Sequence, residues 1–224
     1  MRGFAVDPTI PFVAAPRESA FAPNPQPSSI HARLRAETLA LHRQVEGELD
    51  FLLDASLSLE RYRWVIEAFY GFYRPLEIEL VLRGPMVPPP CFALPARHEL
   101  LRRDLVALGA TARAIDLLPL CAVLPPLAST AERAGSLYVL EGAALGGRVI
   151  ARALVRRAGM GKVNGAAFFT GEGEDTPVRW KSVLAWLEEV GCIERAGDEL
   201  VHAARETFRA LGNWIRAREG SRCR

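Results

Sequence analysis

The sequence lacks the marks of several large protein classes. None of its four cysteines forms a Cys-x-x-Cys pair, and no cysteine and histidine have the spacing of a zinc site. We therefore expect reduced thiols, as in a cytoplasmic protein. No apolar run of about 18 residues is present to span a membrane, and the N-terminus lacks the charged-then-apolar order of a secretory signal. The formal net charge is only +2, which favours neither a nucleic-acid partner nor a membrane partner.

Alternation of apolar and polar residues, which would predict β-strands, is also missing, as is any repeat of fixed period. Apolar residues instead recur every three or four positions, which is typical of amphipathic helices around a core. The sequence predicts one all-α domain over residues 29–220, between a disordered Pro-rich tail (1–28) and a C-terminal tail (221–224). Pro75 is expected to kink its helix or to end a segment. The expected helices cover residues 30–53, 59–83, 96–108, 130–157, 177–190 and 196–218.

The segment 135–154, GSLYVLEGAALGGRVIARAL, has a helical pattern but carries three interior glycines, Gly142, Gly146 and Gly147. Each glycine costs about 1 kcal/mol relative to alanine within a helix, so three within six residues require a reason. One reason is close packing against another helix, or a bend. The other is that the bare backbone lies directly against a large flat group. The segment alone leaves both explanations open.

His42 lies beside the apolar stripe of the first expected helix, and Glu46 follows one turn later. At this spacing the Glu46 carboxylate can accept the imidazole Nδ1–H. Such a bond fixes the tautomer and directs the Nε2 lone pair outward to a metal. A lone histidine on a helix is more often a core or surface residue, but the pair fits one axial metal ligand with its supporting acceptor.

The two helices together fit a haem held between a histidine on one side and bare backbone on the other. The glycine side offers no acid or base at Gly142, Ala143, Gly146 or Gly147. A peroxidase-type site needs such a group to break an O–O bond. Without it, the nearest target of a bound oxidant is the edge of the porphyrin, which favours oxidation of the ring over oxidation of a second substrate.

Three segments resemble parts of the haem oxygenase family. In LRAETLALHRQVEGELDFL, the family's proximal-helix motif L-(K/R)-x-x-T-x-x-x-H-x-x-x-E matches in order and spacing at Leu34, Arg35, Thr38, His42 and Glu46. GSLYVLEGAALGGRVI is similar to the distal helix, especially in members found beside bacterial phytochromes, and FFTGEGEDTPVRW to the segment that follows it. The resemblance covers about residues 30–215 and implies a haem oxygenase-like helical bundle.

The resemblance also implies roles for the matching residues. His42 would be the proximal iron ligand and Glu46 its supporting acceptor. Gly142 and Gly146 would face the distal side of the haem, where the reaction takes place. A guanidinium at Arg35 suits a haem propionate, and Lys181 lies near a second propionate-contacting position. The other expected haem contacts are Thr38, Tyr138 and Gly147.

The implied reaction is the cleavage of haem b, which serves as both cofactor and substrate, by O2 and a reductant. Its products are biliverdin, carbon monoxide and ferrous iron. Electrons would come from an external donor, a ferredoxin or a reductase. The similarity to the phytochrome-associated members further implies that the biliverdin supplies a bacterial phytochrome.

Two positions depart from the animal-type members of the family. Ala143 stands where many of them carry an aspartate that organises the distal water, so backbone carbonyls or Arg148 are expected to hold that water. Ala185 aligns near an animal-type arginine, so the haem orientation and the meso carbon that is cut do not follow from the resemblance. Arg179 is a weaker candidate for a propionate contact. Asp104, beside two arginines, is expected on a solvated ionic face.

Three alternatives stay open at the level of sequence. A haem carrier or sensor could use His42 on the same scaffold without turnover. A di-iron oxidase needs two Glu-x-x-His motifs, and only the one from Glu199 to His202 is present. A thiaminase-like protein needs a reactive cysteine, and no cysteine has a neighbour that would clearly lower its pKa.

Overall fold

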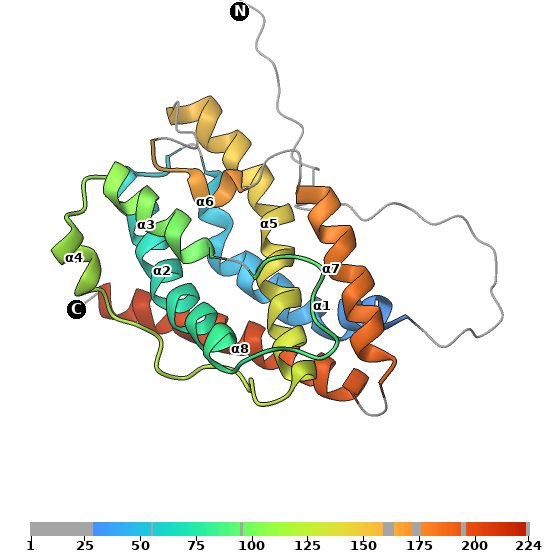
Figure 1. The fold of residues 1–224 in the computed structure, drawn as a ribbon. Coiled ribbons are helices and arrows are strands. Elements are labelled where there is room, and N and C mark those ends of the chain that lie inside the picture. Colours follow the sequence, from blue (N-terminus) through green and yellow to red (C-terminus); the bar gives the residue numbers. More distant parts are fainter. Residues whose placement is uncertain are drawn as a thin grey trace, which may run out of the picture.

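The computed structural model describes residues 29–54, 56–94, 96–158, 164–171, 176–193 and 196–222, and over these residues it contains helices and no strands (Figure 1). The predicted all-α class is therefore confirmed. The predicted tail 1–28 lies outside the described residues. In chain order the elements are α1 (Ile30–Leu49), the 3-10 helix η1 (Asp50–Leu53), α2 (Leu59–Leu82), α3 (Arg97–Ala107), α4 (Ala112–Asp116), α5 (Thr130–Ala158), α6 (Ala167–Thr170), α7 (Thr176–Gly191) and α8 (Ala196–Arg222).

The bounds differ from the sequence-based expectation in three places. Residues 50–53 form a separate 3-10 turn after α1, and α4 was not foreseen. The last helix continues to Arg222, through half of the predicted C-terminal tail. The second helix continues through Pro75 to Leu82, close to its expected end at residue 83. Among the described residues, none of the helices is both long enough and apolar enough to cross a bilayer.

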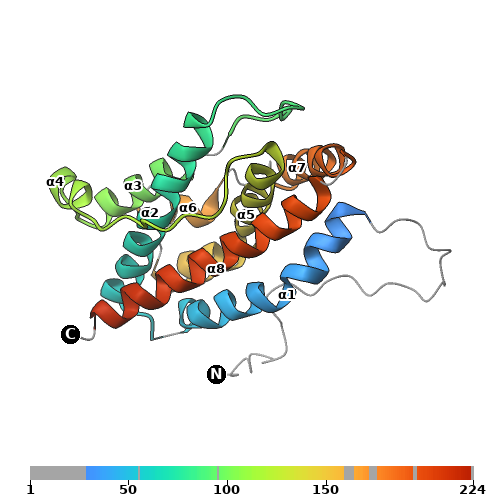
Figure 2. The same ribbon diagram turned by 90° about the horizontal axis from the view of Figure 1, so that it is seen from below.

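Helix α8 is the common support for the two helices that the sequence singled out. Figure 2 shows α1 beside α8 along much of its length. Ion pairs join the two helices near both ends of α1: Arg33 to Asp198 at 2.7 Å and Glu48 to Arg216 at 2.9 Å. The order of these contacts shows that α1 and α8 run in the same direction.

Helix α5 packs on α8 more closely, because a glycine faces it. A Cβ built on Gly135 would lie 2.3 Å from the carbonyl oxygen of Leu200 and 2.7 Å from the amide nitrogen of Ala204. One residue on, the hydroxyls of Ser136 and Thr207 are hydrogen-bonded at 3.0 Å in the core. The absence of a side chain at Gly135 thus allows backbone-to-backbone contact between α5 and α8.

Local side chains define where α1 begins. The Ser29 hydroxyl accepts a hydrogen bond from the amide of Ala32 and so caps α1. The amides of Ile30 and His31 donate to the Glu188 carboxylate of α7, at 2.9 and 3.0 Å. A carboxylate at this position also interacts favourably with the positive end of the helix dipole. The start of α1 is therefore fixed to α7.

Pro75 explains an unusual contact within α2. Proline has no amide hydrogen, so the carbonyl of Gly71, one turn earlier, has no helical donor. The amide of Cys121 takes its place at 2.8 Å. Gly71 must lack a side chain here, because a Cβ would lie 2.5 Å from the carbonyl oxygen of Pro119. The segment between α4 and α5 is thereby attached to the middle of α2.

Candidate functional site

The candidate site is the space between α1 and α5, which both pack on α8. At one end, Thr38 of α1 is hydrogen-bonded to Tyr138 of α5. At the other end, η1 packs against α5. Between these two points, α1 and α5 are not among the described helix pairs that pack closely. Counted from the Thr38–Tyr138 contact, His42 lies one turn further along α1 and Gly142 lies one turn further along α5. We infer from this register that His42 faces the α5 segment that begins at Gly142.

His42 has the geometry that the sequence predicted. Its Nδ1 lies 3.3 Å from Glu46 Oε2, and its ring edge meets the Phe208 ring of α8 at a centroid distance of 5.6 Å. The side chain remains 44% exposed, and no described residue hydrogen-bonds to Nε2. A neutral imidazole that donates through Nδ1 to Glu46 therefore presents its Nε2 lone pair to a ligand.

Glu46 is less exposed than its partner. Burial raises the pKa of Glu46, while the charges of His42 and Arg43 act in the opposite direction. Its second oxygen, Oε1, is buried and has no hydrogen-bond partner among the described residues. One oxygen therefore lies within reach of His42 Nδ1, and the other can accept a further donor.

The three interior glycines of α5 have different surroundings. A Cβ on Gly142 would lie 3.6 Å from the Trp180 ring of α7, an ordinary contact distance. A Cβ on Gly147 would lie 3.3 Å from the Phe169 carbonyl oxygen, so this residue packs against α6. Gly146 is half-buried. Internal packing therefore accounts for glycine at 147 but leaves glycine at 142 unexplained by the protein's own contacts.

Aromatic rings close the end of the gap at Thr38. Trp180 contacts Tyr138 at a centroid distance of 5.7 Å and His31 at 6.2 Å. Burial raises the pKa of Tyr138, opposed by the hydrogen bond with Thr38 and by the charge of Arg35. Thr38 itself is buried and donates to the Leu34 carbonyl at 2.6 Å. Helices α1, α5 and α7 thus meet in one mixed aromatic and polar corner.

Two cations that the sequence singled out lie on the helices that form this corner. Arg35 of α1 and Lys181 of α7 are both exposed. Neither makes an ion pair with another residue in the described ranges. The neighbouring Arg33, by contrast, contacts both Asp198 and Glu37. Arg35 and Lys181 are therefore available to an anionic ligand.

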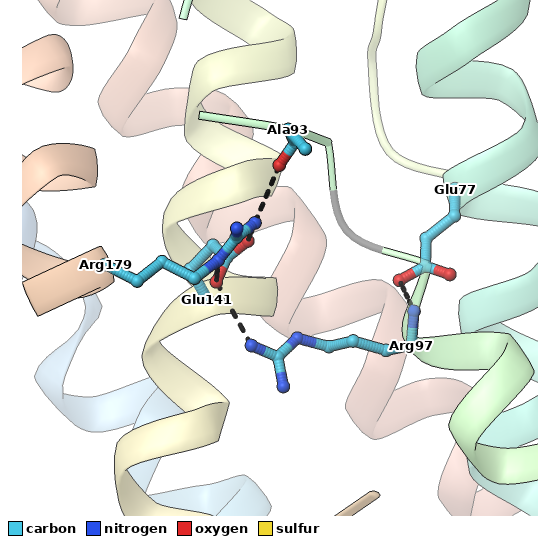
Figure 3. A network of polar contacts seen from close by, with 5 residues as sticks. All are labelled: Glu77, Ala93, Arg97, Glu141 and Arg179. Atoms are coloured by element: carbon cyan, nitrogen blue, oxygen red, sulfur yellow. Dashed lines mark hydrogen bonds and ion pairs between the residues drawn. The ribbon is translucent and has the colours of Figure 1, made fainter. Parts of the chain in front are cut away.

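A buried ionic network holds α5 at the residue before Gly142 (Figure 3). Glu141 is 2% exposed and receives Arg179 of α7 through two bonds, at 2.6 and 2.9 Å, and Arg97 of α3 at 3.1 Å. Arg179 also donates to the Ala93 carbonyl at 2.8 Å, and the Arg97 amide donates to Glu77 of α2 at 3.0 Å. Arg179, considered above for a propionate, is thus paired with Glu141.

Comparison with known proteins agrees with this geometry. The family model described as heme oxygenase matches residues 28–217. The chain belongs to the haem oxygenase family. A heme oxygenase from Xanthomonas campestris pv. campestris (strain 8004) is 44% identical over 89 residues, which are 40% of this chain and 48% of that protein. The match thus spans about half the length of this relative.

The fold also matches that of a family member of known structure. The crystal structures of NO- and CO-bound heme oxygenase from Neisseria meningitidis superpose with a TM-score of 0.67. The match covers 86% of this chain and 93% of that chain at 21% identity. The haem oxygenase fold predicted from the two helix motifs is therefore confirmed.

The donor set suits a haem better than a metal centre built from protein ligands alone. The described ranges contain no group of three or more His, Cys, Asp or Glu side chains that could hold a metal ion. In this part of the chain, the second half of a di-iron site is therefore missing. A single histidine with a free Nε2, opposite bare helix backbone, is the arrangement that one axial haem ligand requires.

The structure shows the surroundings of the positions at which the sequence departs from animal-type members of the family. Ala143 is exposed and offers no acid or base. Arg148, proposed above as an alternative holder of water, is half-buried and makes no ion pair within the described ranges. Ala185 lies exposed on α7. Ala143 therefore brings no acid or base to this part of α5.

The expectation for Asp104 was wrong. Its side chain is buried, not solvated, and accepts hydrogen bonds from the amides of Ala167 and Phe168 at 2.6 and 2.8 Å. Asp104 thereby caps α6, which in turn packs against Gly147. Burial raises the pKa of Asp104 to about 6, although both amide bonds act in the opposite direction. Two adjacent arginines suggested a surface position, but Asp104 lies on the inner face of α3.

Sequence reasoning also missed Glu141. One local signal was available: it is the single charged residue between Arg133 and Arg148, within an otherwise apolar and small-residue stretch. A charge in such a stretch is costly unless it is paired. The partners Arg97 and Arg179 lie 44 and 38 residues away, so no local pattern indicated them.

Proposed function

We propose that this haem oxygenase family member binds haem between α1 and α5 and cleaves it, with O2 and a reductant, to biliverdin, carbon monoxide and ferrous iron. One observation carries the proposal. His42, held by Glu46 with Nε2 free, lies opposite an α5 segment whose glycine at 142 is not required by internal packing. The histidine provides one axial ligand for the iron, and the glycine leaves room for the flat porphyrin to approach the helix.

On the α1 side, His42 would ligate the iron through Nε2. Glu46 accepts the Nδ1–H, which keeps the imidazole in the correct tautomer and orientation. The edge-on contact with Phe208 limits rotation of the ring. When bound, haem supplies the iron that binds O2 and the porphyrin that is oxidised.

On the α5 side, the contribution of the chain is steric. Gly142 and Gly146 are one helical turn apart and so share a face. Because they have no side chains, both glycines allow the haem to approach the helix closely. Neither they nor Ala143 can donate a proton from a side chain. The backbone and the solvent near Ala143 and Arg148 are then the sources of hydrogen bonds on this side.

At the corner of α1, α5 and α7, Arg35 and Lys181 would contact the propionates. Support comes from their exposure and from the absence of an ion-pair partner for either within the described ranges. Tyr138 and Thr38 would contact the haem edge nearby. A guanidinium binds a carboxylate through two parallel bonds, whereas an ammonium acts as a point charge. Arg35 is therefore expected to contribute more than Lys181.

The electron donor, the cellular location and the use of the product are parts of the same proposal. We infer a ferredoxin or a reductase as donor, because no described feature supplies electrons to the site. We infer a cytoplasmic protein because Cys91, Cys121 and Cys192 are free thiols among the described residues. The similarity of residues 135–150 to phytochrome-associated members supports a bacterial phytochrome as the acceptor of biliverdin.

A titration with hemin, followed by ascorbate or a ferredoxin–reductase pair under O2, tests the proposal. We expect a one-to-one Soret band that decays, with biliverdin recovered by chromatography. A stable Soret band without decay would instead show a carrier or sensor. Failure to bind haem at a one-to-one ratio would show that only the fold is shared with the family.

A further inference from the structure

The ionic network at Glu141 lies at the start of the α5 segment that faces the gap. It connects α5 with three other parts of the structure: α7 through Arg179, α3 through Arg97, and the 84–94 loop through the Ala93 carbonyl (Figure 3). Glu77 of α2 holds the start of α3 in turn, by accepting the amides of Arg97 and His98. The contacts converge from several directions on one carboxylate.

The burial of this network makes its geometry strict. The side chains of Glu141, Arg97 and Arg179 are 2%, 8% and 15% exposed. A buried charge must keep its partners, because water cannot replace them. Arg179 meets Glu141 through a two-point contact that fixes orientation as well as distance. Any rotation of α5 about its axis would break these bonds.

Rotation of α5 would also move the two glycines that lie one and five residues beyond Glu141. Successive residues on a helix are about 100° apart, and backbone Cα atoms lie about 2.3 Å from the axis. A rotation of about 20° would thus move the Cα of Gly142 or Gly146 by about 0.8 Å. Displacements of this size at a reacting centre change rates by about two orders of magnitude.

Helix α7 is tied to the same point. Trp180, the residue after Arg179, contacts Tyr138 and lies 3.6 Å from the position of a Cβ on Gly142. The Arg179–Glu141 pair therefore sets the position of the Trp180 ring over α5. One ionic contact fixes both the bare backbone and the aromatic wall beside it.

We propose that Glu141, with Arg97 and Arg179, is a positioning residue that sets the axial rotation of α5 and thereby selects which meso carbon of the haem is cut. This inference rests on the proposed function. The Glu141 carboxylate is held by Arg97 and Arg179, and it acts through Gly142 and Gly146. The proposal assigns specificity to a buried ion pair at the residue that precedes Gly142 on α5.

The test compares the wild-type protein with Glu141→Gln and Arg179→Met, and with Arg63→Met as a matched control. Arg63 also forms a 2.9 Å ion pair, with Glu67, on helix α2, which is not among the described helices that pack closely on α5. Two properties are measured: amide hydrogen exchange of residues 138–147 in the haem-free protein, and the ratio of biliverdin isomers after turnover. Exchange of the α8 amides serves as an internal reference, so that a general loss of stability is distinguished from a local change in α5. The isomer ratio is a ratio of products and does not depend on the amount of folded protein.

We expect exchange of the α5 amides to rise about tenfold in both network variants relative to α8. The isomer ratio should change by about threefold or more, since sub-ångström shifts are enough to alter it. Arg63→Met should match the wild type in both properties. If Glu141→Gln does not fold, Arg179→Met carries the test, because it leaves the Arg97–Glu141 pair in place.

Unchanged exchange and an unchanged isomer ratio in a folded network variant would overturn the inference. Absence of haem cleavage by the wild-type protein would overturn the proposed function instead. In that case the exchange experiment still decides whether Glu141 fixes α5. A change in exchange without a change in isomer ratio would show that Glu141 supports the helix but does not select the carbon.

Discussion

Helices α1 and α5 face each other across the same gap but are held in different ways. The ion pairs of α1 with α8 involve partly exposed side chains, such as Arg33 with Asp198 and Arg216 with Glu48, and such pairs contribute about 0–1 kcal/mol each. Helix α5 is held by backbone contact at Gly135 and by the buried carboxylate of Glu141. Apart from its start, which Glu188 holds, α1 is joined to α8 by partly exposed ion pairs, whereas α5 is joined to its neighbours by close backbone contact and a buried carboxylate.

This difference matches the different roles proposed for the two helices. In the proposed function His42 forms a bond to the iron, and the exposed ion pairs between α1 and α8 allow small adjustments of α1 when it does so. Helix α5 has no side chain at Gly142 or Gly146 that could bind the haem, so it can orient the haem only through a fixed backbone position. The proposed contribution of α1 can therefore be recognised from its residue types, whereas that of α5 depends on the position of its backbone.

The largest effect should follow from loss of the ligand on α1. His42→Ala is expected to remove normal axial ligation and to lower turnover on the order of 100-fold or more, because the haem loses its fixed position. Absorption and EPR spectra of the ferric complex measure the ligation, and biliverdin formation measures turnover. His202→Ala, on the exposed face of α8, is the control. An unchanged spectrum with full activity would show that His42 is not the ligand.

Two glycine substitutions on α5 should separate packing from function. Gly135→Ala is expected to destabilise the fold by about 1–3 kcal/mol, because its Cβ would collide with α8. Gly142→Ala should instead raise stability by up to about 1 kcal/mol through helix propensity, yet weaken haem binding. Urea unfolding of the haem-free protein and hemin titration measure the two effects. Tight haem binding by Gly142→Ala would count against close approach at this residue.

The support of α5 by α6 should depend on pH through Asp104. The pKa of Asp104 in the folded protein, about 6, is above its ordinary value of 3.8. Its contribution to stability is therefore complete below pH 3.8 and is lost as pH rises towards 6, by about 2 kcal/mol or less. The difference in unfolding free energy between wild type and Asp104→Asn should thus change as pH is lowered from about 7 to about 5, with the wild type gaining stability relative to the variant. A constant difference would contradict this titration.

The smallest effect is expected at Glu46. Glu46→Gln keeps an oxygen that can accept the His42 Nδ1–H but removes the charge, so turnover should fall by only about tenfold. The iron–histidine stretching frequency of the ferrous protein reports the weakened bond directly. Glu48→Gln, whose partner is Arg216 on α8, provides a neighbouring control. Equal frequencies in Glu46→Gln and wild type would show that Glu46 does not act on the ligand.

The sequence predicted the parts of this molecule that depend on local pattern. The long helices and the His42–Glu46 pair all involve residues within four positions of one another, where periodicity and propensity give a direct signal. Their bounds were right to within a few residues for α2 and α5. The helical class and the family followed from these local patterns.

What sequence reasoning missed depends on contacts between distant segments. Asp104 was taken for a surface residue because its neighbours are arginines, but its partners are amides about 60 residues later. The three interior glycines of α5 look alike in sequence, yet Gly147 packs against α6 and Gly142 does not need to be glycine for packing. Only the three-dimensional surroundings distinguish a glycine that serves the fold from one available to a ligand.

Pro75 has a consequence for how the chain tolerates change. A substitution such as Pro75→Ala would normally be regarded as repairing a helix, since it restores an amide donor to the Gly71 carbonyl. Here that carbonyl already accepts the Cys121 amide, so the restored donor would compete with the segment between α4 and α5 for a single acceptor. The apparent defect in α2 is therefore an attachment point. A consensus-based stabilisation that removed it would strengthen one helix and loosen the connection that leads into α5.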